Sequence, residues 1–237
     1  MKKVYYLPTI GANDSFQKEY FPEDYIPAPK KFSSGYDRNY SHAKCPAWKE
    51  WGKNIWVFYQ PFDLGMIYKS ETKYLETNLP QEMFDEFFLQ TPNWLDGELP
   101  EIQFRYGWCF WTKEKDVWIE QLPHFQICRF SIEPIPGTFP LSVWQRPINF
   151  GFKILDHDTN IWIPKGTPLF MVKLYSQRSD SNFLLEKRVP PEDVLEKQSQ
   201  NLRLKEFDRY ASWELIQNRL KKEQEESKCP FKFLWKK

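Results

Sequence analysis

The chain has 237 residues, of which 41% are hydrophobic and 27% charged, and its formal net charge is +1. This balance is typical of a globular protein, and it excludes a general affinity for nucleic acid or anionic membranes that rests on net charge. We find no apolar stretch near the ~20 residues that a membrane-spanning helix needs, so we expect no membrane contact.

Aromatic side chains are unusually common, with eleven Trp, twelve Tyr and twenty Phe making up 18% of the residues. Flat rings pack well on the pleated surface of a sheet, and each buries a large area with few rotatable bonds. Nineteen Pro against nine Gly indicate rigid, extended connections, since proline fixes φ. We therefore expect a β-rich aromatic core.

The chain begins with a predicted strand over residues 2–10, which runs to an aromatic, Pro-rich segment at 11–45. That segment has no periodicity, and we expect it to lie over the body of the domain with its rings inward, because disordered segments contain few aromatics. Residues 46–51 predict a short helix with Pro46 at its first position.

A continuous apolar run at residues 55–59 predicts a strand buried on both faces. Residues 64–68 and 73–75 follow as a predicted hairpin around a polar turn. Residues 80–88 predict a second short helix, because Met83, Phe84, Phe87 and Phe88 lie on one side of it.

A series of strands is predicted from residue 102 onward. The expected strands are residues 102–112, 116–122 and 126–132, and then, beyond a Pro-rich loop at 133–147, residues 147–155, 161–163 and 168–175. Within 147–155, apolar residues alternate with polar ones or glycine, which predicts a half-buried strand.

The composition changes after residue 188. Pro190, Pro191 and the two acids after them predict a helix start, and residues 192–226 are expected to be helical, in two pieces. An apolar stripe of Leu204, Phe207, Ala211 and Leu215 needs an apolar partner surface. We expect it to pack on its own chain, and the alternative is contact with a second copy in a homo-oligomer.

These elements predict a mainly β (α+β) fold. We expect an aromatic-rich β-sandwich or distorted barrel with short inserted helices over residues 1–188, and a helical C-terminal arm with an aromatic, basic tail, packed on that domain, over residues 189–237. The four cysteines have no metal-type spacing and no secretory leader precedes them, so we expect reduced thiols and a cytoplasmic location.

One metal site is conceivable from the three histidines of the chain. His157 with Asp158 or Asp156, and with His124 or His42, could form the two-histidine, one-carboxylate set that holds Fe(II). The chain would then be a metal-dependent oxygenase or hydrolase containing Fe or Zn. The simpler interpretation is a solvated turn, which Asp and Asn favour.

The best candidates for ligand binding are aromatic residues in loops. Trp144 lies in the Pro-rich loop beside Arg146, so a stacking ring and a bidentate donor would stand together. Trp94 is a further candidate platform. Most other tryptophans are expected in the core.

The ending of the β-rich part carries a resemblance. Ile163 to Val172, with Lys165-Gly166 at the turn, is similar to the β-clip of trimeric nucleotide hydrolases. Together with Tyr106-Gly107-Trp108, Trp118-Ile119 and Pro136-Gly137, it resembles uncharacterised proteins of bacteriophages and bacteria that form a domain of unknown function. The resemblance covers residues 40–175 and implies a phage-encoded chain in the host cytoplasm or the virion. The catalytic Asp and phosphate-binding Ser motifs of the hydrolases have no counterpart, so it implies no activity.

The sequence thus predicts a non-catalytic binding or structural accessory protein without a cofactor. We expect it to contact a protein or small-molecule partner through aromatic loops and the basic C-terminal arm, and we do not expect a nucleic-acid partner, because positive charges are offset within the same segments.

Overall fold

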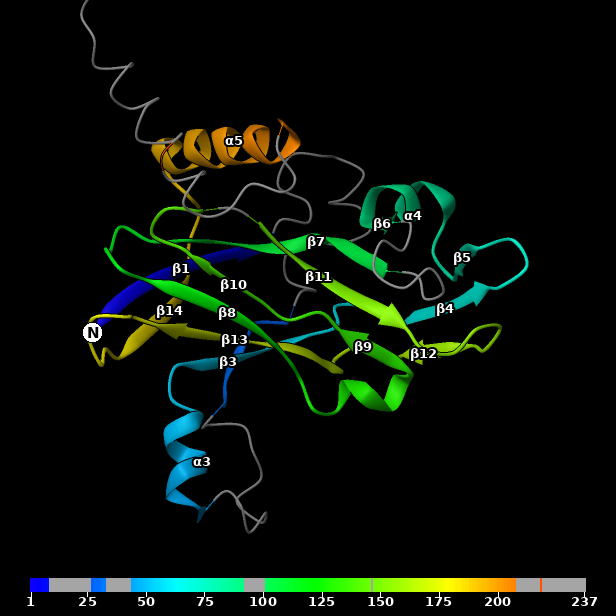
Figure 1. Ribbon diagram of the computed structural model, residues 1–237, viewed down its shortest axis with the longest axis horizontal. Coiled ribbons are helices and arrows are strands. Elements are labelled where there is room, and N and C mark those ends of the chain that lie inside the picture. The colour runs from blue at the N-terminus through cyan, green and yellow to red at the C-terminus, as the bar shows by residue number, and fades with distance from the viewer. Residues whose placement is uncertain (9–26, 33–43, 92–100, 146, 208–217, 219–237) are drawn as a thin grey trace, which may run out of the picture.

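The computed structural model describes residues 1–8, 27–32, 44–91, 101–145, 147–207 and 218, and these residues form three β-sheets with a few helices (Figure 1). The first sheet has the strand order β14-β1-β7-β11-β9, with β6 also paired to β7. Its strands are β1 (Lys2–Pro8), β6 (Phe88–Thr91), β7 (Glu101–Trp111), β9 (Ile132–Pro134), β11 (Pro147–Ile154) and β14 (Phe183–Lys187).

The second sheet has the order β10-β8-β13-β3-β2 and is antiparallel throughout. Its strands are β2 (Lys30–Lys31), β3 (Ile55–Tyr59), β8 (Trp118–Pro123), β10 (Gly137–Pro140) and β13 (Pro168–Tyr175). A smaller third sheet, in the order β12-β4-β5, contains β4 (Leu64–Lys69), β5 (Tyr74–Thr77) and β12 (Ile161–Ile163).

Aromatic rings join the first two sheets into a sandwich. Phe58 of β3 and Phe170 of β13 stack with centroids 5.0 Å apart, and Phe58 meets Trp108 of β7 edge to face at 5.1 Å. Phe170 also stacks on Phe150 of β11 at 5.4 Å. Rings from both sheets thus form one buried cluster, which confirms the predicted mainly β fold with an aromatic core. Among the described strands both sheets keep edge strands, so the structure is a sandwich rather than a barrel.

Several strands occur where their patterns predict them. In β11 the inward residues Ile148, Phe150, Phe152 and Ile154 are all buried, and their neighbours are half-buried. Strand β3 is buried at four of its five residues, as its apolar run predicts. The predicted hairpin is present as β4 and β5, paired antiparallel.

The predicted strand at residues 126–132 is wrong. The chain instead forms the 3-10 helix η3 (Ile127–Phe130), and β9 starts only at Ile132. Local turn bonds replace a strand ladder here, because the Ile127 N–H donates to the His124 carbonyl at 3.0 Å and the Gln126 N–H to His124 Nδ1 at 3.2 Å. The Pro-rich segment that was expected to be a loop contains β9 and β10.

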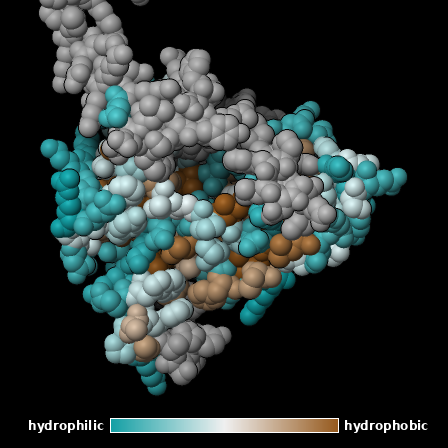
Figure 2. All heavy atoms as spheres, in the orientation of Figure 1, coloured by the Kyte–Doolittle hydropathy of each residue, from teal (hydrophilic) through white to brown (hydrophobic). Residues whose placement is uncertain are grey.

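The helices are α3 (Pro46–Trp51), α4 (Gln81–Phe87) and α5 (Glu192–Phe207). Both α3 and α4 lie where short helices are predicted, and α3 has Pro46 at its start. None of the helices in the described part of the chain combines the length and the apolar character that crossing a membrane requires. In the orientation of Figure 1, hydrophilic residues occupy much of the surface, with apolar ones grouped near the middle (Figure 2).

Helix α5 lies on the outer face of the first sheet, opposite the sandwich core (Figure 1). Val194 packs against Cys109 and Trp111 of β7, and the Asn201 amide donates to the Gln145 carbonyl at 3.1 Å. The predicted apolar stripe at Leu204, Phe207, Ala211 and Leu215 and the basic tail lie outside the residues whose side chains the structure describes.

Candidate functional site

Trp144 is 3% exposed, so the expectation that its ring is a surface platform is wrong. The chain turns tightly after β10, and the Trp144 N–H donates to the Pro140 carbonyl at 2.8 Å. This turn places the ring in the interior, where its apolar area leaves water. Arg146 and Trp94 lie outside the described residues.

The predicted metal ligands are not brought together. The described part of the chain contains no group of three His, Cys, Asp or Glu side chains that could hold a metal ion. His42 lies outside the described residues, but His124, His157 and Asp158 are all within them, and each has a structural environment of its own.

His124 is fully buried beside η3, where Nδ1 accepts the Gln126 N–H. Burial disfavours the charged imidazolium and lowers the pKa of His124 to about 4. A ring that is neutral and shielded from water at this position stabilises the turn before η3.

Asp158 lies in the exposed turn between β11 and β12. Its carboxylate accepts hydrogen bonds from the hydroxyl and the backbone N–H of Ser70, and these bonds lower its pKa. The neighbouring His157 ring meets Tyr68 edge to face at 5.3 Å. His157 and Asp158 therefore connect their turn to β4 and to the turn that follows β4. This agrees with the simpler interpretation of a solvated polar turn.

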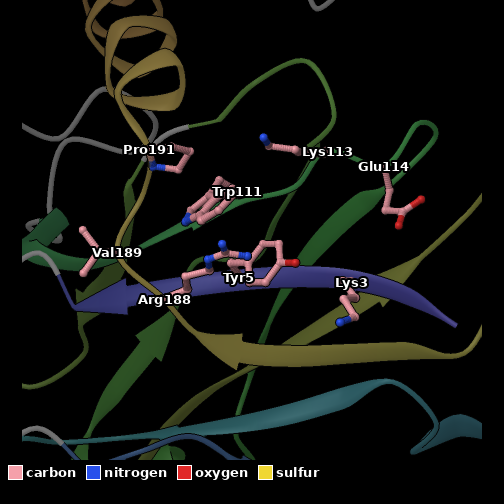
Figure 3. A pocket seen from close by; sticks show the side chains of 8 residues that line it. All are labelled: Lys3, Tyr5, Trp111, Lys113, Glu114, Arg188, Val189 and Pro191. Carbon is pink, nitrogen blue, oxygen red and sulfur yellow. The ribbon is translucent and has the colours of Figure 1, made fainter.

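A cavity of about 240 Å³ lies elsewhere, on the outer face of the first sheet where α5 begins. We call it the Tyr5–Trp111 pocket, and Figure 3 shows its two rings at the centre of the lining residues, beside the start of α5. The pocket is lined by Lys3, Tyr5, Trp111, Lys113, Glu114, Arg188, Val189 and Pro191.

Strand alternation places these side chains on one face. In β1, Val4 and Tyr6 point into the sandwich core, so Lys3 and Tyr5 point outward. The ladder pairs Tyr5 with Trp111 directly. Their rings stack with centroids 4.4 Å apart, which makes an aromatic floor for the pocket.

Trp111 combines deep burial with an unmet hydrogen bond. The residue is 1% exposed, and its Nε1–H is buried with no hydrogen-bond partner among the described residues. A buried donor without a partner costs about 1–3 kcal/mol. Because this atom is closed to solvent, a ligand in the pocket cannot take its hydrogen while the ring stays in this place.

Three cations surround the aromatic floor. The guanidinium of Arg188 lies over the Tyr5 ring, 5.2 Å from its centroid. Lys3 of β1 and Lys113 of the turn after β7 also line the pocket. Glu114 is the one carboxylate among the described lining residues, and none of these four ionic groups forms an ion pair within the described chain.

Three hydrogen bonds fix the backbone at the edge of the pocket. The Thr112 hydroxyl donates to the Lys3 carbonyl at 2.7 Å and accepts the Glu114 N–H at 3.1 Å, which fixes the turn after β7. The Arg188 N–H donates to the Tyr6 carbonyl at 3.0 Å and so extends the β14–β1 pairing to the pocket rim.

Sequence reasoning did not find this pocket. The period-2 pattern in β1 carries the only local signal, since it puts Lys3 and Tyr5 on one side of a strand. Nothing local shows that residues 3, 111 and 188 become neighbours.

A wider groove of about 640 Å³ between α3 and the turn after β13 is less suited to a ligand. Several of its polar side chains bond to one another: Ser179 bonds to Ser176 and Ser181, and Lys53 pairs with Glu50 at 2.6 Å.

Comparisons of the chain with protein-family models, with curated proteins and with solved structures found no match.

Proposed function

We propose that this chain is a binding protein that holds a small anion with a flat apolar part in the Tyr5–Trp111 pocket. The observation that carries the proposal is that Lys3, Lys113 and Arg188 line one cavity with a single described carboxylate, beside the stacked rings of Tyr5 and Trp111. An anion in this cavity would be attracted by all three cations.

Charge supports an anionic ligand. Three cations and one carboxylate line the pocket. One unit charge 4 Å from an opposite charge gains about 1 kcal/mol in water and about 4 kcal/mol at the effective dielectric near a protein surface. A ligand phosphate or carboxylate would gain this from each ammonium group that it reaches.

The aromatic floor and the volume define the rest of the ligand. A flat apolar group can pack against the half-buried ring of Tyr5, which is backed by Trp111. The pocket, at about 240 Å³, is below the ~300–1,000 Å³ that is usual for small-molecule sites. This suits a small aromatic acid or one modified side chain rather than a dinucleotide.

The lining favours binding over catalysis. Its described residues include no Ser, Cys or His, and its one carboxylate, Glu114, has neither a His nor a second carboxylate in the lining to form an acid–base pair with it. The buried thiol nearest the pocket, Cys109, has its pKa raised to about 12 by burial, so it remains protonated at neutral pH.

The first test is calorimetric titration with phenyl phosphate, inorganic phosphate and phenol. We expect phenyl phosphate to bind best, because it alone carries both the anion and the flat ring, and we expect its affinity to fall as salt rises. Equal binding of phosphate and phenyl phosphate would remove the role of the aromatic floor. No binding of either at low salt would overturn the proposal.

The second test compares Lys113→Gln with Lys115→Gln, an equal charge change in the same turn but outside the pocket. Lys113→Gln should weaken phenyl phosphate binding about 5-fold, equivalent to ~1 kcal/mol, and should change the unfolding free energy of the ligand-free protein by no more than about 0.5 kcal/mol, as is usual for a surface substitution. Lys115→Gln should change neither quantity. Equal effects of the two variants would show that only net charge matters.

A further inference from the structure

A second surface, on the third sheet, has features that the proposed anion site does not use. In β12, Ile161 and Ile163 are buried and Trp162 points outward, with 49% of its surface exposed. A tryptophan is usually buried because of its large apolar area. Trp162 is exposed and borders a cavity, and contact with a ligand would explain this placement.

Gly65 lets the Trp162 ring lie flat on the sheet. The two residues are paired in the β12–β4 ladder. A Cβ at position 65 would lie 3.0 Å from Cε3 and 3.1 Å from Cζ3 of Trp162, closer than carbon atoms normally approach. One face of the indole therefore rests on the β4 backbone, and the ring borders a cavity of about 250 Å³.

Polar groups stand beside this ring. The β4–β5 ladder pairs Ile67 with Glu76, and the β12–β4 register, continued by one residue, sets Asn160 opposite Ile67. Glu76 and Asn160 are both exposed and line the same cavity. The outward face thus carries an aromatic platform with a carboxylate and an amide next to it.

Asn78 fixes the wall of the cavity and does not offer its amide to a ligand. Its Oδ1 accepts the Gly65 N–H at 2.8 Å, and its Nδ2 donates to the Asp63 carbonyl at 3.2 Å. These bonds hold the end of β5 against β4 and keep the surface under Trp162 in place.

We propose that this face, defined by Trp162, Glu76 and Asn160, binds a neutral carbohydrate. The C–H groups on one side of a pyranose ring carry partial positive charge and pack on the negative face of an indole. Ring hydroxyls can donate to the carboxylate of Glu76 and exchange hydrogen bonds with the amide of Asn160.

Charge distinguishes a sugar from a nucleotide here. Lys69 is the cation nearest the cavity in the β4–β5 ladder, and it lies 3.9 Å from the carboxylate of Glu76. The Glu76 carboxylate would repel a phosphate-bearing ligand. Lys69 would attract such a ligand only weakly, because it is already paired with Glu76. A neutral polyhydroxy ligand has no such repulsion.

A second aromatic lies on the same face. Tyr74 is 41% exposed and is paired with Lys69, four residues along β4 from the Gly65 position. At about 3.3 Å per residue along a strand and about 4.8 Å between strands, the two positions are ~13 Å apart along the strands and ~10 Å apart across them, or ~16 Å in all. Gln81 donates to the Tyr74 hydroxyl at 3.2 Å and holds it in place. An oligosaccharide with more than one unit therefore fits this face better than a single sugar.

The test is electrophoresis of the full chain through native gels that contain a neutral β-glucan, a xylan or a galactomannan. We expect at least one polysaccharide to retard the chain. Trp162→Ala should lower the affinity by about 10-fold or more, the effect of losing an aromatic stacking platform. The matched control is Trp51→Ala on α3, which removes another exposed tryptophan and should leave the retardation unchanged.

Gly65→Ala gives an independent check, because its added methyl group displaces the Trp162 ring without removing it. It should weaken retardation while thermal unfolding shows a folded chain. Absence of retardation by all three polysaccharides would overturn the proposal, as would undiminished retardation of Trp162→Ala. Binding of a fluorescent oligothymidine that depends on Trp162 would assign the face to nucleic acid instead. Dimerisation that depends on Trp162 would assign it to a second copy.

Discussion

Individual side chains in this protein serve either the fold or a surface, and burial separates the two groups. His124 was a candidate metal ligand and is fully buried beside a turn. Lys3 and Lys113 belong to no recognisable sequence motif, yet they line a pocket. A residue type limits the chemistry that a position can perform, but the environment of the side chain decides whether that chemistry is available.

His124 predicts a specific pH dependence of stability. Its pKa is about 4 in the folded protein against 6.5 for an ordinary histidine, so below pH 6.5 the unfolded chain binds a proton that the folded chain does not. Stability should therefore fall as the pH drops from about 6.5 to 4, by about 3 kcal/mol in total.

Urea unfolding of the wild type and of His124→Asn, at pH 7 and at pH 4.5, measures this effect. Asparagine keeps an acceptor for the Gln126 N–H but has no proton to gain, so the variant should lose much less stability between the two pH values. The carboxylates of Asp116 and Asp158 have lowered pKa values, and their contributions are lost only at lower pH. An equal pH slope in both proteins would contradict the assignment.

Among the elements, α5 is attached to the sheet by unusually polar contacts. Gln198 donates to the Cys109 thiol, Asn201 to the Gln145 carbonyl, and the Gln145 amide to the Thr112 carbonyl at 2.8 Å. Val194 is the buried apolar side chain of this contact. Specific hydrogen bonds therefore set the position of the helix, and with it the pocket rim at Val189 and Pro191.

Asn201→Ala should destabilise the protein by about 1–2 kcal/mol, because it leaves the buried Gln145 carbonyl without this donor. Gln200→Ala, a neighbouring exposed amide, should have little effect, and thermal or urea unfolding of both variants provides the comparison. Similar losses in the two variants would show that helix propensity, rather than the contact with Gln145, determines the result.

At the scale of the whole molecule, the sandwich depends on rings that cross between its sheets. Phe58 is fully buried and contacts Phe170 of its own sheet and Trp108 and Phe110 of the opposite one. Phe58→Ala should lower the unfolding free energy by about 3–5 kcal/mol. Phe58→Leu should cost less, since it leaves a smaller void. A loss below ~1 kcal/mol in Phe58→Ala would mean that the two sheets are held by other contacts.

Local patterns determined much of the secondary structure. The alternation in β11, the apolar run in β3 and the turn between β4 and β5 are features of neighbouring residues, so the sequence predicts them directly. The aromatic composition also predicted the kind of core. The phage-like origin, the cytoplasmic location, the role of the C-terminal arm and the packing of its residues beyond the described part of α5 stay predictions.

What only the tertiary structure decided is which strands and which side chains meet. Strand β1 lies between β7 and β14, which come from the middle and the end of the described chain, and the pocket exists only because of that pairing. Likewise Trp144, in a segment predicted to be a loop, is 3% exposed, whereas Trp162, in a predicted strand, is 49% exposed. The reason is physical: backbone periodicity depends on adjacent residues, whereas strand order and burial depend on contacts between segments far apart in the chain.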